Sequence, residues 1–313
     1  MDPFKVHILG CGSALPTLQH YASSQVVELR EKLFMIDCGE GTQIQLRRCH
    51  IHFSRITAVF ISHLHGDHCF GIPGMISTFG MTGRTAPLHI YGPAAYEPVL
   101  NQTLDFFCQG LEFKVVFHPV VTKEKTIIYE DRGLTVESIP LEHRIECCGY
   151  LFKEKPTLPH IRRDMIDFYH IPVSQINNIK AGADWITEEG EKIPNSMLTA
   201  PAKAPRSYAY CSDTRYMKNL HKIVKGVSTL YHESTYATED EDRAHLYWHS
   251  TSRQAATVAK DASVGKLVLG HFSARYQNEE KILEEAKEVF PNCLLYTSPS
   301  PRDRSLSRMP SSA

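Results

Sequence analysis

Apolar and polar positions alternate along this chain in two patterns, one typical of strands and one of amphipathic helices. Short runs of β-branched and aromatic residues predict strands within 4–16, 25–42 (two strands), 56–68, 87–93, 134–154 (paired strands), 207–214, 227–235 and 265–276. Helices are predicted at 41–49, 71–81, 250–262 and 278–290. This succession of strands, turns and helices predicts a layered α/β protein with two facing sheets and helices outside.

Two segments depart from this pattern. Residues 153–206 are rich in Pro, Lys, Arg and Asn and poor in apolar runs, which predicts an insertion with one or two short helices that protrudes from the core. Residues 296–313 are rich in Ser, Pro and Arg and have no periodicity. We expect them to be a disordered or non-native tail and leave them out of the functional argument.

Composition narrows the class of protein. The 313 residues carry 34 Lys and Arg against 35 Asp and Glu, so a nucleic-acid partner would require a local basic patch rather than a generally basic surface. No apolar run approaches the roughly 20 residues that span a bilayer, and no signal peptide is evident, so we expect a cytoplasmic protein without a membrane partner. The nine cysteines include no C-x-x-C pair and predict thiols in a reducing compartment.

The densest chemical signal follows the apolar run at 56–61. His63, His65, Asp67 and His68 occupy four of six positions, with Gly66 between them. Residues two apart share a side of an extended chain, and we expect the glycine to turn the chain so that the second pair faces another position. Imidazoles and carboxylates are good zinc ligands, so one motif can supply two neighbouring metals.

Two metals require further ligands, and three residues at predicted strand ends are the candidates. They are His143, Asp213 and His271. A lone histidine at such a position is more often structural than a ligand. Beside the first motif, these three residues complete a set of seven in which Asp213 bridges the metals.

The H-x-H-x-D-H pattern with a distant His, Asp and His resembles the metallo-β-lactamase superfamily. Finer motifs resemble ribonuclease Z, the endonuclease family that trims the 3′ trailer from precursor tRNA. They are "SHLHGDHCFGIPG" (62–74), "SDT" (212–214), "HESTY" (232–236), "GHFSARY" (270–276), "LGCGSALPT" (9–17) and "DCGEGTQIQL" (37–46). The resemblance covers about residues 4–295. It implies one αββα sandwich domain over 1–295, in which residues 153–206 form a tRNA-binding arm.

The resemblance also implies a metal arrangement and a reaction. His63, His65 and His143 would hold one Zn²⁺, and Asp67, His68 and His271 the other. Asp213 would bridge the two ions of each subunit, and Mn²⁺ is a possible substitute. A hydroxide between the metals would attack the scissile phosphorus and leave a 3′-hydroxyl on the tRNA.

Three residues receive catalytic roles from the same resemblance. Asp67 would orient or deprotonate the attacking water. His249 would protonate the leaving 3′ oxygen, because histidine can give a proton near neutral pH. Glu233 would hold His249, although either residue could instead only support the metal ligands.

The resemblance further implies precursor tRNA as partner and a homodimer in which one subunit's arm holds tRNA for the other. Candidate substrate contacts are Arg84, Lys153, Lys155, Arg162, Arg163, Lys180, Ser273 and Arg275.

Two other functions remain open at this point. A small-molecule phosphodiesterase, thioesterase or aryl-sulfatase of the same superfamily would use the same metals but would not need a remote arm. A non-catalytic RNA-binding module would be expected to have lost metal ligands, whereas all seven candidates are present here.

Overall fold

The computed structural model describes residues 4–15 and 17–296. The chain divides into two compact units, one formed by the residues up to Lys153 and from Arg206 onward, the other by Glu154–Pro205. The tail expected at 296–313 lies, from residue 297 onward, outside the described residues.

The larger unit contains two facing mixed sheets. The first has the order β1 (Phe4–Gly10), β3 (Ser24–Leu29), β4 (Lys32–Cys38), β5 (Ile56–Phe60), β6 (Leu88–Gly92) and β7 (Val115–Pro119). The second has the order β19 (Cys293–Leu295), β17 (Leu267–Gly270), β16 (Thr229–Glu233), β15 (Ser207–Cys211), β10 (Cys148–Glu154), β9 (Leu134–Pro140) and β8 (Ile127–Glu130). A small parallel pair joins β2 (Gly12–Ser13) to β18 (Phe272–Ser273).

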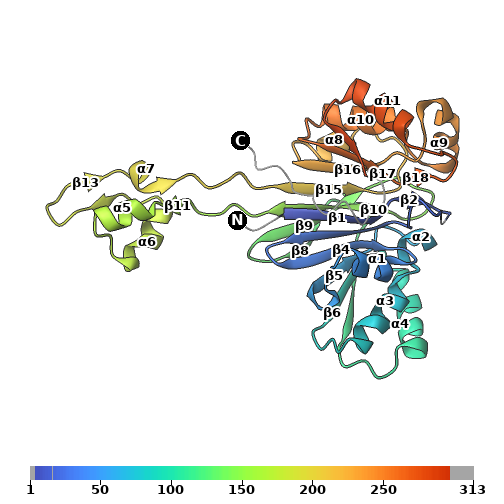
Figure 1. Cartoon of the computed structure of the whole chain (residues 1–313), viewed down its shortest axis with the longest axis horizontal. Helices are drawn as coiled ribbons and strands as arrows, with labels where there is room; N and C mark the ends of the chain where they lie inside the picture. Colours follow the sequence, from blue (N-terminus) through green and yellow to red (C-terminus); the bar gives the residue numbers. More distant parts are fainter. Residues whose placement is uncertain (1–3, 16, 297–313) are drawn as a thin grey trace. The chain divides into compact units, whose positions relative to one another are not determined.

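Helices cover the outer faces of both sheets (Figure 1). The first sheet carries α1 (Thr42–Arg48), α3 (Ile72–Met81) and α4 (Tyr96–Phe107), and the second carries α8 (Leu220–Ile223), α10 (Ser252–Asp261) and α11 (Glu280–Val289). The remaining helices of this unit are α2 (Gly66–Cys69), α9 (Glu241–Tyr247) and the 3-10 turns η1 (Phe53–Arg55) and η2 (Thr238–Asp240). The predicted layering, two facing sheets with helices outside, is confirmed.

Strand β4 is apolar on both faces because each face packs in a different core. Side chains alternate across a strand, so Phe34 and Ile36 enter the core between the sheets, whereas Met35 packs in the core beneath α3. The rings of Phe60 and Phe152 join the two sheets with centroids 5.4 Å apart.

Residues 94–133 received no assignment from the sequence and contain α4, β7 and β8. The exposed face of α4 carries Val99, Phe106 and Phe107, which blurs the apolar periodicity by which a helix is recognised. No helix of the described residues is both long and apolar enough to cross a bilayer. Eight of the nine cysteines are buried, and no disulfide joins described residues.

The smaller unit has its own core of Ile171, Ile179, Ile193 and Leu198. It contains α5 (Arg163–Phe168), α6 (Val173–Lys180) and α7 (Asn195–Leu198), one helix more than the sequence predicts. Two short strand pairs complete it, β11 (His160–Ile161) with β14 (Thr199–Ala200) and β12 (Trp185–Ile186) with β13 (Lys192–Ile193). All of these elements lie between β10 and β15 in the chain, and Figure 1 labels the three helices, β11 and β13.

Candidate metal centre and active site

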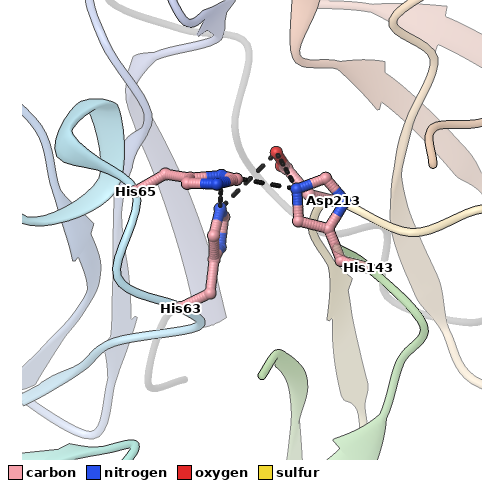
Figure 2. A group of neighbouring side chains, drawn as sticks. All are labelled: His63, His65, His143 and Asp213. Atoms are coloured by element: carbon pink, nitrogen blue, oxygen red, sulfur yellow. Dashed lines mark hydrogen bonds and ion pairs between the residues drawn. The ribbon is translucent and has the colours of Figure 1, made fainter. Parts of the chain in front are cut away.

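Four predicted ligands meet in what we call the His63 set: His63, His65, His143 and Asp213. Figure 2 shows these side chains converging from separate loops, which follow β5, β9 and β15. His65 Nδ1 lies 3.0 Å from His63 Nε2 and 3.3 Å from His143 Nε2. Asp213 Oδ2 lies 3.6 Å from His63 Nε2 and 3.8 Å from His143 Nε2.

The other three predicted ligands form the His68 set: Asp67, His68 and His271. Asp67 and His68 lie on α2, and His271 follows β17 directly. His68 Nε2 is 3.4 Å from His271 Nε2 and 3.5 Å from Asp67 Oδ2. Asp213 Oδ1 lies 3.1 Å from His271 Nε2 and 3.4 Å from His68 Nε2, so the two carboxylate oxygens face different sets.

These distances fit two zinc ions. Four ligands placed tetrahedrally at about 2.0–2.1 Å from zinc lie about 3.3–3.4 Å from one another. In the His63 set, the distances from His65 Nδ1 and from Asp213 Oδ2 given above run from 3.0 to 3.8 Å, and the His68 set with Asp213 Oδ1 gives 3.1–3.6 Å. All ligand atoms of each set lie within 4.8 Å of one another. The donor set of imidazoles and carboxylates is also the one that zinc prefers.

Asp37 fixes the orientation of one histidine in each set. Its Oδ2 accepts from His68 Nδ1 at 2.7 Å and from the Ser62 hydroxyl at 2.8 Å. Because the single Ser62 hydroxyl proton is used there, Ser62 Oγ accepts from His63 Nδ1 at 3.0 Å. Both rings therefore turn Nε2 toward the set, as a metal ligand requires.

Glu233 plays the matching part for two other histidines. Its Oε1 accepts from His249 Nδ1 at 2.9 Å, and its Oε2 accepts from the Thr235 hydroxyl at 2.6 Å. Thr235 Oγ1 in turn lies 2.9 Å from His271 Nδ1 and accepts from it. His143 is held differently, since its Nδ1 donates to the Trp248 carbonyl at 2.9 Å.

The ring nitrogens that face one another in the two sets favour a bound cation. Burial lowers the pKa of His63, His65 and His143, which favours the neutral, ligating form. Burial also opposes a charge on His68, but Asp213, Asp37 and Asp67 outweigh it and raise the His68 pKa well above the usual range. The carboxylates thus hold a proton among the ligands, and a metal ion would take the place of that proton.

Three residues of the site have left-handed backbone, which is uncommon outside glycine. They are Asp37 (φ 54°), Trp248 (φ 62°) and His271 (φ 60°). Such conformations cost about 1–3 kcal/mol each and persist where the surroundings impose them. Here the left-handed backbone places the Asp37 carboxylate, the Trp248 carbonyl and the candidate ligand His271 beside the two metal sets.

The expectation for Gly66 was wrong in its reason. Gly66 is not among the glycines with positive φ, and it begins α2. A Cβ at this position would lie 2.3 Å from the Phe70 ring, so the glycine makes room for that ring. The Phe70 side chain is 72% exposed.

A pocket opens beside the two sets. Its walls are formed by Ser13, Ala14, Ala22, Glu40, His65, Gly66, Asp67, Phe70, Arg144, Asp213, His249 and His271. The Ala14 N–H donates to Asp67 Oδ2 at 2.9 Å, which links the small-residue wall to the His68 set. Burial opposes protonation of His249, but the neighbouring Glu233 charge raises the pKa of His249 to about 9.

The predicted substrate contacts in the larger unit have varied surroundings. The Arg84 guanidinium is buried, stacks on Phe79 and donates to the carbonyls of Ala86 and Pro87, which does not support a phosphate contact. Lys153 bonds Glu137 at 2.7 Å.

The remaining predicted substrate contacts lie in the "GHFSARY" segment and in the smaller unit. Arg275 bonds Asp240 at 2.8 Å, and Ser273 belongs to β18. Arg162, on the smaller unit, pairs with Asp164 at 2.6 Å. The other predicted contacts on that unit are Lys155, Arg163 and Lys180, of which Arg163 is exposed.

Sequence reasoning missed Asp37, Ser62, Thr235 and the Trp248 carbonyl. The sequence did contain an indication for Asp37, because this acidic residue follows the apolar run 33–36 and begins the motif "DCGEGTQIQL". The hydroxyls carry no such signal, since Ser and Thr follow many strands.

Comparisons with known proteins find relatives that match nearly the whole chain. Ribonuclease Z of Bacteroides fragilis is 56% identical over 295 residues, which cover 94% of this chain and 97% of the relative. Ribonuclease Z of Porphyromonas gingivalis is 48% identical over 290 residues, covering 93% and 95% of the two chains. A family model described as anti-Pycsar protein Apyc1 matches residues 4–159.

Solved structures give the same fold. The short form of human tRNase Z has a TM-score of 0.65 and 27% identity, covering 88% of this chain and 94% of that one. The metallo-β-lactamase fold protein YhfI of Bacillus subtilis has a TM-score of 0.67 at 18% identity, covering 96% and 98%, and supports the αββα fold alone. With this fold, and with relatives that match it over nearly their whole length, the chain belongs to the ribonuclease Z family of endonucleases.

Proposed function

We propose that this chain removes the 3′ trailer from precursor tRNA as a zinc-dependent endoribonuclease and leaves a 3′-hydroxyl on the tRNA. The observation that carries the proposal is Asp213, whose two oxygens face two separate sets of histidine and aspartate ligands beside an open pocket. Two adjacent metal positions are typical of enzymes that cleave phosphodiesters.

The His63 set would hold one zinc ion and the His68 set the other, with Asp213 shared, and Mn²⁺ is a possible substitute. Zinc ions bound there would lower the pKa of a water and neutralise charge on the phosphate. The protein's own part is to hold the ligand rings, through Asp37 and Glu233, in the orientation described above.

Asp67 is proposed to orient or deprotonate the attacking water. Burial opposes ionisation of Asp67, but the neighbouring His68 charge and the contact with His271 outweigh it and hold the pKa of Asp67 well below its usual range, so the carboxylate is ionised. The Ala14 N–H fixes this carboxylate at the pocket wall.

His249 is proposed as the general acid for the leaving 3′ oxygen. Its Nδ1 donates to Glu233, so Nε2 is the atom that would deliver a proton. Glu233 is fully buried and also accepts from the Thr214 N–H at 2.9 Å, which leaves it one orientation. Glu233 therefore acts through His249 and has no contact of its own with substrate in this proposal.

The smaller unit is proposed to bind the tRNA substrate. Lys155, Arg162, Arg163 and Lys180 supply positive charge on one short excursion of the chain, which suits phosphate contacts that position RNA without reading its sequence. A homodimer and a cytoplasmic location are proposed with it, on the basis of the family resemblance.

Mapped cleavage of a precursor tRNA tests the proposal. Wild-type protein should cut directly after the discriminator nucleotide, lose activity with a chelator, and regain it with Zn²⁺ or Mn²⁺. Absence of cleavage with two metals bound would contradict the proposal.

Deleting residues 155–200 separates the tRNA substrate from the alternative of a small-molecule phosphodiesterase. The shortened protein should hydrolyse bis(p-nitrophenyl) phosphate normally and lose most tRNA cleavage. Equal loss of both activities would contradict the role proposed for the smaller unit, and hydrolysis of small diesters alone by wild-type protein would favour the alternative.

A further inference from the structure

Arg144 has an unusual position at the rim of the pocket. It follows His143 on the loop between β9 and β10, is exposed, and lines the pocket together with His65 and His249. No proposed step of the reaction uses it so far.

The surroundings of Arg144 place it on the His249 side of the pocket. Its guanidinium lies over the Tyr247 ring, 5.8 Å from the centroid, and Tyr247 is two residues before His249. The ring of His143, its chain neighbour, lies 5.0 Å from that of His249 between centroids. An aromatic face holds a guanidinium by a cation–π contact and leaves its N–H groups available.

Arg144 differs from the neighbouring arginines in its charge partners among the described residues. Arg215, also near this loop, is paired with Glu142, and Arg275 is paired with Asp240. Within the part of the chain that the structure describes, no carboxylate oxygen lies within 4.0 Å of the Arg144 guanidinium, the distance at which an ion pair is counted. An arginine presented in this way fits an anionic ligand, and its planar fork matches two phosphate oxygens.

We propose that Arg144 binds the phosphate one nucleotide upstream of the scissile bond, on the tRNA side. The inference rests on the proposed function, in which His249 serves the leaving 3′ oxygen. That oxygen belongs to the discriminator nucleotide, whose own 5′ phosphate is the next negative group on the same strand. By holding this phosphate, Arg144 positions the leaving oxygen at His249.

Charge-neutral substrates test this contact directly. A methylphosphonate, in either stereoisomer, replaces the upstream phosphate of a precursor tRNA. Wild-type kcat/KM should fall about 10- to 100-fold, as expected when one charged hydrogen-bonding partner is lost. Arg144→Ala should show a similar fall on the normal substrate and no further fall on the methylphosphonate.

Four controls make the result specific. Arg144→Lys should recover part of the activity on the normal substrate, because it keeps the charge but not the fork. Arg253→Ala, which removes an exposed arginine paired with Glu288, should cleave like wild type. Metal content and hydrolysis of bis(p-nitrophenyl) phosphate, which has no upstream phosphate, should be unchanged in Arg144→Ala.

Different results would overturn different claims. Independent, multiplicative losses from Arg144→Ala and the methylphosphonate would overturn the contact. A loss on bis(p-nitrophenyl) phosphate as large as that on tRNA would mean that Arg144 acts on the scissile phosphate or on the fold, and would also overturn it. Failure of wild-type protein to cleave any precursor tRNA would instead overturn the proposed function, and this inference with it.

Discussion

Asp37 and Glu233 occupy matching positions in opposite sheets, and comparing them shows how the site is organised. Both are fully buried, Asp37 near the end of β4 and Glu233 at the end of β16. Each accepts directly from one histidine and reaches a second through a hydroxyl, Ser62 for Asp37 and Thr235 for Glu233. One carboxylate from each sheet thus orients two rings at the shared edge.

The difference between them lies in which rings they hold. Asp37 serves His63 and His68, one from each candidate metal set. Glu233 serves His271, which belongs to the His68 set, and His249, the proposed proton donor. In the proposed mechanism, Asp37 would therefore support metal binding alone, whereas Glu233 would couple the metal centre to proton transfer.

Removing Asp37 should have the largest effect. Its carboxylate accepts from four groups, which are the Ser62 N–H, the Ser62 hydroxyl, His68 Nδ1 and the Tyr210 hydroxyl. Asp37→Ala would leave them without this acceptor in a buried site, so we expect the free energy of unfolding to fall by about 3–5 kcal/mol. Metal affinity should fall about 10- to 100-fold. Urea titration and metal analysis by mass spectrometry measure the two effects.

Asp37→Asn separates the missing charge from the cavity. An amide oxygen accepts fewer hydrogen bonds than a carboxylate, so metal affinity should still fall, with a smaller loss of stability. Normal metal content in both variants would show that the histidines orient themselves without Asp37.

Glu233→Gln should affect catalysis more than metal content. The amide keeps the volume, but it removes the charge that favours a protonated His249. If His249 is the general acid, kcat for precursor tRNA should fall about 100-fold, within the range of acid–base contributions. Single-turnover cleavage under saturating protein measures this change.

A sulfur leaving group distinguishes proton donation from structural support. In a substrate with sulfur in place of the scissile 3′ oxygen, the departing thiolate needs no proton. Glu233→Gln and His249→Ala should therefore cleave this substrate nearly as fast as wild type does. An equal loss on both substrates would assign the pair to support of the metal centre alone.

The sequence was informative where residue type and strand position coincide. The seven candidate ligands could be predicted because they are His and Asp residues at predicted strand ends, and such side chains converge where strands end at one edge of the sheets. Asp37, Ser62 and Thr235 share the strand-end position, but hydroxyls and a single carboxylate are common there. Their role depends on which ring nitrogen lies opposite, and that is decided by packing between distant segments.

Charged surface residues could be assigned least well from sequence. Whether Arg84 is buried on Phe79 or Arg275 is paired with Asp240 depends on neighbours that are remote in the chain. Nothing in the sequence pattern distinguishes Arg144 from other arginines, although it lines the pocket. The same limit applies to α4, whose exposed aromatic residues conceal its apolar face.

The smallest expected effects come from the two hydroxyl relays, and they sharpen the comparison most. Ser62→Ala and Thr235→Val each remove one link between a carboxylate and a ligand ring while leaving the carboxylate in place. We expect metal affinity, measured by competition with a chelator, to fall about tenfold in each variant. Ser62→Ala should slow cleavage of the oxygen and sulfur substrates equally, because the His63 ring that Ser62 holds is proposed only as a metal ligand. Thr235→Val should slow cleavage of the oxygen substrate more than that of the sulfur substrate, because the Thr235 hydroxyl also donates to Glu233, the carboxylate that holds His249. If the ratio of oxygen to sulfur cleavage rates were the same in both variants, the different roles given to Asp37 and Glu233 would be contradicted.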